Sequence, residues 1–236
     1  MSVSRRLVTV AATCALLVTG CSLPGLSTSS GPGAKTGQSA GASSAGASSP
    51  AAKISRRAGE SVDVAEFSKE IKASQEKITI TTSEIITETN GVTTKQTKVT
   101  DTSDKSRPKA KIDSEVAGKK QQIIIIGSTV YAKKEGDAKW TKTTDNDDFN
   151  NSELLSKITF SKVTYVGLET MDGEQLQHYA TEMSMFGITG PADVWLDSQS
   201  RVRRSSSALS GTKITIKMSN FNKPVTITEP PASEVQ

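Results

Sequence analysis

The feature that most constrains the fold is a series of short segments rich in Thr, Val and Ile, separated by turn residues. In such segments, side chains that point to one face of a sheet alternate with side chains that point to the other. Residues 213–218 alternate apolar and polar side chains at every position. Asn90-Gly91 and Asp172-Gly173 are typical of tight hairpins between strands. The sequence therefore predicts a large antiparallel sheet.

Two helices are expected beside the strands. Asp63 followed by Glu66 resembles a capping box and marks the start of the first. A second is expected over residues 148–158. Their apolar faces consist of Val64, Phe67, Ile71 and Ile78 in the first helix and of Leu154, Leu155 and Ile158 in the second. The expected strands cover residues 78–89, 92–100, 109–116, 121–126, 129–133, 139–143, 162–170, 175–183, 192–197, 201–208, 212–219 and 225–228.

One expected strand is unusual because residues 123–126 are four successive isoleucines. An alternating strand has one apolar face, whereas this one presents apolar side chains to both faces. Two explanations are open. Either the protein covers both faces of this strand, or one of them lines an apolar cavity.

The N-terminus has the three parts of a bacterial secretory signal: a basic start, an apolar segment over residues 7–18, and small residues after it. The apolar segment is too short for a mature membrane-spanning helix. Residues 17–21, Leu-Val-Thr-Gly-Cys, resemble the lipobox of bacterial lipoproteins. This resemblance implies that residues 1–20 are removed and that Cys21 receives fatty acids such as palmitate, which would anchor the protein to the extracytoplasmic face of the cell membrane. A plain secretory signal that happens to precede a Cys is the alternative.

Residues 21–59 are expected to form a tether. Of the 26 residues in 27–52, 24 are Ser, Gly, Ala, Pro or Thr, so this segment has almost nothing to bury and should be disordered. A flexible chain of this length spans on the order of 35 Å. All ten aromatic residues occur at or after Phe67. We therefore place the folded domain at residues 60–236.

The composition gives little support to nucleic-acid or metal chemistry. Lys and Arg number 29 against 25 acidic residues, and loss of the signal removes two of the arginines. So small an excess gives no reason to expect a nucleic-acid partner. Cys14 lies in the signal and Cys21 would carry lipid, which leaves the domain without a disulfide. With one His and no Cys pair at ligand spacing, we expect no metal and no cofactor.

The residue patterns also predict a protein without catalytic activity. His178 is the single histidine, has no Ser or Cys nucleophile motif beside it, and is expected on a strand surface. Residues 74–77 and 210–213 match Ser-x-x-Lys but lack the companion motifs of that enzyme class. The acidic run at 145–148 lacks the Gly and distal Glu of a calcium loop.

Basic residues suggest two further surfaces. Lys53, Arg56 and Arg57 end the tether and could touch anionic lipid headgroups, although charges at a linker end are expected to be solvated. A larger set could form a rim that holds a phosphate or carboxylate headgroup, or could simply keep the surface soluble. Its members are Lys119, Lys120, Lys133, Lys134, Arg201, Arg203 and Arg204.

Several motifs along the domain carry a family resemblance. They are the run 127–131, Gly-Ser-Thr-Val-Tyr, with Trp140 after it; Gly173 with Tyr179; the run 191–197, Pro-Ala-Asp-Val-Trp-Leu-Asp; and the run 219–225, which leads to Pro230-Pro231. Together with the lipobox and tether, they resemble the LppX/LprG-type lipoproteins of actinobacteria over roughly residues 60–232.

That resemblance implies an α+β fold, a strongly curved antiparallel half-barrel like that of the LolA/LolB carriers, with helices packed on its concave face and a hydrophobic cavity between them. It also implies binding of an acylated lipid or lipoglycan and help in its transfer across the cell envelope, with an envelope transporter as a further partner. A dry slot suits such cargo because each exposed methylene costs about 0.8 kcal/mol. The candidate cavity residues are Phe67, Ile71, Ile80, Ile124, Ile126, Leu154, Leu155, Ile158, Tyr165, Tyr179, Val194 and Leu196.

Two alternatives stay open. Periodicity does not separate a cavity wall from an ordinary core face, so each candidate could simply pack in the core. The whole domain could also be a non-catalytic interaction or regulatory module with a solid core, which binds a protein partner in the envelope.

Overall fold

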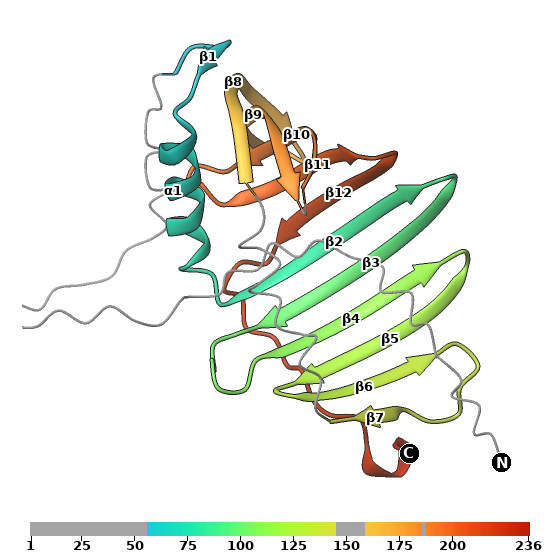
Figure 1. Ribbon diagram of the computed structural model, residues 1–236. Coiled ribbons are helices and arrows are strands. Elements are labelled where there is room, and N and C mark those ends of the chain that lie inside the picture. Colours follow the sequence, from blue (N-terminus) through green and yellow to red (C-terminus); the bar gives the residue numbers. More distant parts are fainter. Residues whose placement is uncertain (1–55, 145–158, 186) are drawn as a thin grey trace, which may run out of the picture.

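Tight turns between the Thr/Val/Ile-rich segments fold the chain into one antiparallel sheet (Figure 1). The computed structural model describes residues 56–144, 159–185 and 187–236. At the first predicted hairpin, Asn90 and Gly91 have φ angles of 50° and 78°, the positive values that a two-residue hairpin of this kind requires. The predicted signal, Cys21, most of the tether and the predicted helix at 148–158 lie outside the described residues.

The described part contains one α-helix, α1 (Val64–Gln75), and a short 3₁₀ helix, η2 (Ala232–Glu234). Asp63 caps α1 as predicted, since its side chain accepts a 2.8 Å hydrogen bond from the backbone N–H of Glu66. The strands are β1 (Glu60–Ser61), β2 (Ile80–Thr89), β3 (Val92–Asp101), β4 (Lys109–Val116), β5 (Lys119–Ile126), β6 (Thr129–Lys134), β7 (Thr141–Thr143), β8 (Thr159–Met171), β9 (Glu174–Met185), β10 (Ile188–Leu196), β11 (Val202–Leu209) and β12 (Thr212–Ser219).

The strand order is β1-β8-β9-β10-β11-β12-β2-β3-β4-β5-β6-β7. The sheet is open, because β1 and β7 lie at opposite ends of this order. Figure 1 shows β2–β7 side by side, with β8–β11 turned sharply away from them at one end and α1 beside the turn. This curved, open antiparallel sheet confirms the predicted half-barrel.

Most of the predicted strands agree with the structure, and those at 109–116 and 212–219 match β4 and β12 at both ends. The strand predicted at 225–228 is wrong. Those residues have no strand pairing, and Val225 and Ile227 instead pack against the sheet as part of the C-terminal segment. Their alternation reflects burial of every second side chain on a surface. β1 was not predicted.

Register separates the sheet into two faces, since directly paired residues of neighbouring strands share a face. Tyr179, which contacts Phe67 of α1, pairs with Val194, and the same row continues through Ile216 and Ile85. We call this side the helix face and the other side the opposite face. The alternation predicted for β12 is confirmed, because Ile214, Ile216 and Met218 are buried on the helix face.

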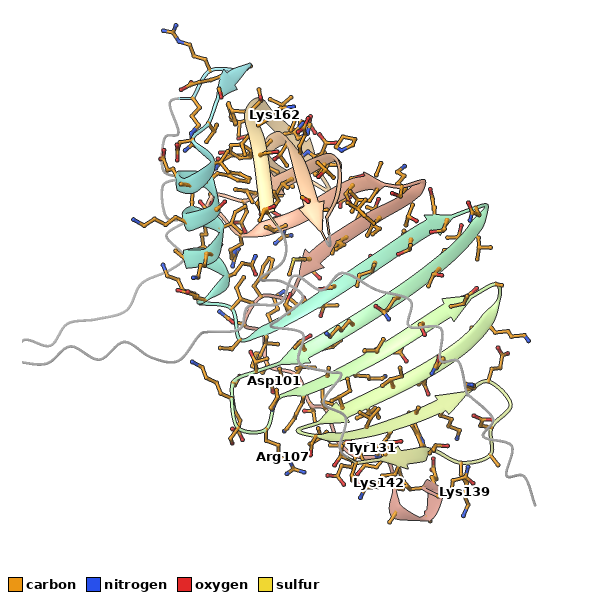
Figure 2. All side chains as sticks on the ribbon, in the orientation of Figure 1. Asp101, Arg107, Tyr131, Lys139, Lys142 and Lys162 are labelled. Atoms are coloured by element: carbon orange, nitrogen blue, oxygen red, sulfur yellow. The ribbon has the colours of Figure 1, made fainter. Side chains whose placement is uncertain are left out.

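The C-terminal segment covers part of the opposite face near β7. Trp140 forms a parallel bridge with Val235. The backbone N–H of Trp140 donates to the backbone carbonyl of Glu234 over 2.7 Å. Arg107 and the hydroxyl of Tyr131 both donate to the Glu229 carboxylate, each over 2.9 Å. Figure 2 shows Arg107, Tyr131 and Lys142 together at this end of the sheet.

This arrangement answers the question raised by the four isoleucines of β5. Ile124 and Ile126 lie on the opposite face, in a buried cluster with Tyr131, Trp140 and Ile227. Ile123 and Ile125 belong to a separate cluster on the helix face. Apolar clusters of the protein therefore lie on both faces of this strand.

Candidate functional site

The structure brings six of the predicted cavity residues together on the helix face, around α1. They are Phe67, Ile71, Tyr165, Tyr179, Val194 and Leu196. The Phe67 ring meets that of Tyr179 with centroids 5.0 Å apart and that of Phe160 edge-on at 5.7 Å. Within the described residues this group, which we call the α1 cluster, also includes residues of β2, β11 and β12.

The buried hydroxyl of Tyr179 is fully hydrogen-bonded. It accepts from Arg56 Nη1 over 2.7 Å and donates to Gln177 Oε1 over 2.8 Å. Burial raises the pKa of Tyr179 above its usual 10.0, although the Arg56 charge acts in the opposite direction. The prediction that Arg56 is solvated is therefore wrong: its side chain is largely buried and also contacts the carboxylates of Glu66 and Glu70.

Three predicted cavity residues lie elsewhere. Ile80 is half-buried and by register lies on the opposite face, while Ile124 and Ile126 lie beneath the C-terminal segment. The remaining candidates, Leu154, Leu155 and Ile158, are outside the described residues, as is Cys21.

The helix face carries a second apolar group farther along the sheet, on β4, β5 and β6. It consists of Ala110, Ile112, Ile125 and Val130, with Ile123 packed against them. No α1 side chain belongs to it among the described residues. We call this group the β4–β6 patch.

Sequence patterns missed a buried polar strip between these two apolar groups. On β2 and β3, Thr81 pairs with Thr100 and Ser83 pairs with Lys98, and all four side chains are buried. The lysine is only 2% exposed. Alternation in the sequence did not mark it, because polar residues occupy positions 94, 96, 98 and 100 of β3 and most positions of its other face as well.

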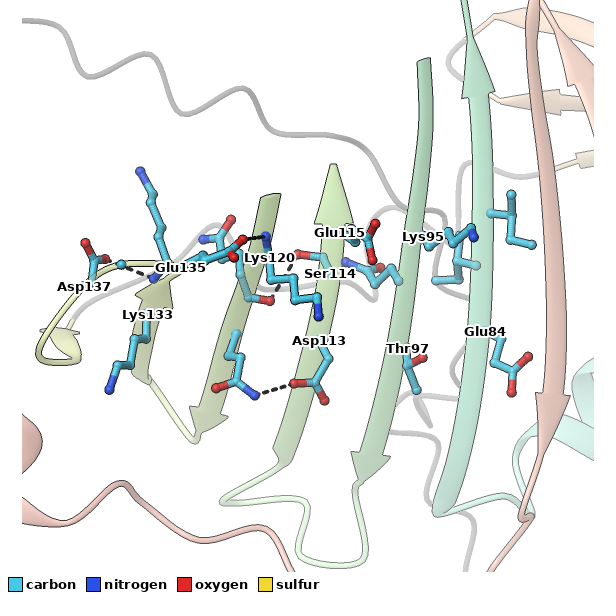
Figure 3. A pocket seen from close by; sticks show the side chains of 17 residues that line it. Glu84, Lys95, Thr97, Asp113, Ser114, Glu115, Lys120, Lys133, Glu135 and Asp137 are labelled. Atoms are coloured by element: carbon cyan, nitrogen blue, oxygen red, sulfur yellow. Dashed lines mark hydrogen bonds between the residues drawn. The ribbon is translucent and has the colours of Figure 1, made fainter. Parts of the chain in front are cut away.

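A groove of about 590 Å³ crosses β2–β6 on the opposite face (Figure 3). Two rows of side chains line it, and register places Glu84, Thr97 and Asp113 in one row and Lys95 and Glu115 in the other. Most of its lining side chains are charged or polar, with Ile85 and Ile86 as exceptions, so this groove is a poorer match to an acyl chain than an apolar slot would be. A second hollow of about 200 Å³, near Arg203 and Lys217, is also polar.

His178 lies on strand β9, as predicted, but its side chain is mostly buried by its neighbours rather than exposed on the surface. Its Nδ1 lies 2.7 Å from Glu169 Oε1 and its Nε2 lies 2.8 Å from Asp193 Oδ1, and its ring stacks on Trp195 at 4.5 Å. The Trp195 indole donates to Glu169 over 2.8 Å, and this hydrogen bond, followed by the His178 contact, lowers the pKa of Glu169. The group joins β8, β9 and β10 on the opposite face and has no nucleophile in these contacts.

The predicted basic rim is not assembled. Arg201 and Arg203 pair with Asp197 and Glu174, and Arg204 lies over the Trp195 ring. These residues are on or beside β11, whereas the lysines of the set are on β5 and β6, with β12, β2, β3 and β4 between. In the described ranges no group of His, Cys, Asp and Glu side chains is arranged to hold a metal ion. Nor does any described helix have the length and hydropathy to cross a membrane.

Comparison with known proteins identifies the fold. No family model and no curated protein sequence matches the chain. Among solved structures, Mycobacterium tuberculosis lipoprotein LppX matches with a TM-score of 0.53 and 16% identity, over 70% of this chain and 98% of LppX. The chain has the LppX fold. LprF from Mycobacterium bovis matches equally well, with a TM-score of 0.53 and 11% identity, over 70% of this chain and 94% of LprF. The resemblance to LppX/LprG-type lipoproteins is thus confirmed at the level of the fold.

Proposed function

We propose that the protein is a lipid-anchored envelope lipoprotein that binds an acylated lipid or lipoglycan on the helix face and helps to transfer it across the envelope. Its anchor would be the acylated Cys21. The observation that carries the proposal is the β4–β6 patch, a second buried apolar group on the helix face whose cluster includes no α1 side chain among the described residues.

The chemistry of such cargo explains why an open sheet is useful. A lipid with two or three acyl chains cannot cross an aqueous space unaided, because each exposed methylene costs about 0.8 kcal/mol. A slot between a curved sheet and a helix can widen when cargo enters, whereas a closed barrel has a fixed interior. In this proposal α1 forms one wall, through Phe67 and Ile71, and the β4–β6 patch accepts acyl chains.

The second candidate function is an interaction module with a solid core. The α1 cluster favours it, because Phe67, Tyr179 and Leu196 are fully buried and in mutual contact through one cluster. Both hollows described above are lined mostly by charged and polar side chains and lie on the opposite face, where a protein partner could dock.

Native mass spectrometry with lipid extraction distinguishes the two functions. The chain from residue 22 to 236, produced without acylation in an actinobacterial host, is expected to carry a diacyl or triacyl lipid at about one per protein. Ile123→Trp, at a half-buried position beside the patch, should displace that lipid. Gln122→Trp, at the preceding residue and on the opposite face, is the matched control and should leave it bound. A protein of bare mass that takes up no added envelope lipid would favour the interaction module.

A further inference from the structure

The last residues of the predicted tether are built into the folded domain. The backbone N–H groups of Gly59 and Val62 each donate a 2.8 Å hydrogen bond to a carbonyl of β8, and β1, which lies between them, pairs with the same strand. The side chain of Arg56, farther along towards the tether, is only 17% exposed. We call residues 56–62 the strap. The strap is held to the domain both by its backbone and by this arginine.

Arg56 bridges α1 to the sheet. Its Nη1 donates to the hydroxyl of Tyr179 on β9 over 2.7 Å, and its guanidinium lies 3.4 Å from the Glu66 carboxylate and 3.9 Å from that of Glu70, both on α1. Hydrogen bonds that involve a charged group are roughly twice as strong as neutral ones. A single side chain of the strap therefore joins the helix to the sheet through polar contacts.

The C-terminal half of α1 is held by a different segment. Ser200, in the loop between β10 and β11, donates to the Glu70 carboxylate, and its backbone carbonyl accepts from the Ser74 hydroxyl over 2.7 Å. Apolar contacts such as those of Phe67 also join helix and sheet, but apolar attraction is non-directional. Loss of the Arg56 contacts would therefore loosen the N-terminal half of α1, while Ser200 retains the C-terminal half.

We propose that the strap is a lock on α1. With Arg56 in place the helix is closed on β9, and withdrawal of Arg56 lets the N-terminal half of the helix move away from the sheet. Because the strap continues directly into the predicted tether, a displacement of the tether acts on Arg56 before it reaches α1. By linkage, whatever moves α1 away from Tyr179 also releases the strap. This inference rests on the proposed function for its use, since α1 is one wall of the proposed slot, and it adds how that wall opens.

Hydrogen–deuterium exchange of the chain from residue 22 to 236, without added lipid, tests the lock. The exchange rate of a protected amide reports how often its hydrogen bond opens. In Arg56→Gln the amides of residues 67–71 should exchange at least about tenfold faster, because hydrogen bonds to a charged group are lost. Amides of β4 and β5 should keep their rates. Arg57→Gln removes the neighbouring, exposed charge and should change neither set.

Tyr179→Phe tests the lock from the side of the sheet, because it removes the hydroxyl and keeps the ring. Exchange at the strap amides Gly59 and Val62 should rise severalfold, and this variant decides the matter if Arg56→Gln loses cooperative unfolding. Unchanged strap exchange in Tyr179→Phe or unchanged α1 exchange in Arg56→Gln would overturn the lock. An equal increase in β4 and β5 would also overturn it, because the effect would then be a global loss of stability. Since no lipid is present, a failure of the proposed lipid binding would leave this result standing.

Discussion

Replacement of Phe67 by alanine tests whether the α1 cluster is a continuous core. Phe67 has no exposed surface, and its ring contacts those of Phe160 and Tyr179. Truncation of a buried Phe to Ala costs about 3–5 kcal/mol, and each aromatic pair adds about 0.5–1.5 kcal/mol beyond its buried area. We therefore expect Phe67→Ala to lower the free energy of unfolding by about 4 kcal/mol. A domain of this size has a total of only about 5–15 kcal/mol.

Urea unfolding at pH 7, followed by tryptophan fluorescence, measures this loss. Leu168→Ala is the control, because Leu168 is 60% exposed and its truncation should change the free energy by less than about 1 kcal/mol. A loss below about 1 kcal/mol for Phe67→Ala would refute the packing described for α1. It would mean that the helix lies on the sheet without filling a shared core.

Three further predictions follow from local contacts. Because the Trp195 hydrogen bond lowers the pKa of Glu169, the stability that this carboxylate contributes is present above its usual pKa of 4.5 and is lost as the pH falls through the lowered value. The difference in urea midpoint between the unaltered protein and Glu169→Gln should thus be largest at pH 7 and shrink towards pH 3; a constant difference would contradict it. In Gly190→Ala the new Cβ would overlap the backbone carbonyl oxygen of Ala208, which should cost about 1–3 kcal/mol in thermal unfolding, and an unchanged melting temperature would show that this approach is not so close. Deletion of residues 231–236 removes the backbone hydrogen bonds to Trp140 and exposes its indole, so tryptophan fluorescence should shift to longer wavelength. An unshifted spectrum would argue against the coverage of Trp140 by this segment.

Local patterns were sufficient to predict the strands of this sheet because their residues alternate and their turns are marked. The Asn90-Gly91 turn and the alternation of β12 are both local signals, and both are found as predicted. The alternation of Val225 and Ile227 is equally local, yet it arises from packing on the opposite face without a partner strand. Pairing depends on a second segment, which a local pattern does not report.

The candidate site was only partly predictable, because membership of a cluster depends on strand order. The order places β8–β12 beside β2, which gathers Phe67, Tyr179 and Val194 but leaves Ile124 on the opposite face. The same order places Glu169 of β8 and Asp193 of β10 on either side of His178 of β9. A single histidine in the sequence gave no indication of these two carboxylate partners. Lys98 was overlooked because β3 has polar side chains on both of its faces. Only the register with β2 shows which of the two polar rows is buried.

Photo-crosslinking gives the most direct test of lipid binding on the helix face. A diacyl lipid with a photoreactive group at the end of one acyl chain is loaded, irradiated, and its attachment sites are mapped by peptide mass spectrometry. The account predicts attachment to helix-face residues of β4–β6, such as Ile112, Ile123 and Ile125. Attachment confined to opposite-face residues of the same strands, such as Gln122 and Ile124, or no attachment at all, would contradict it.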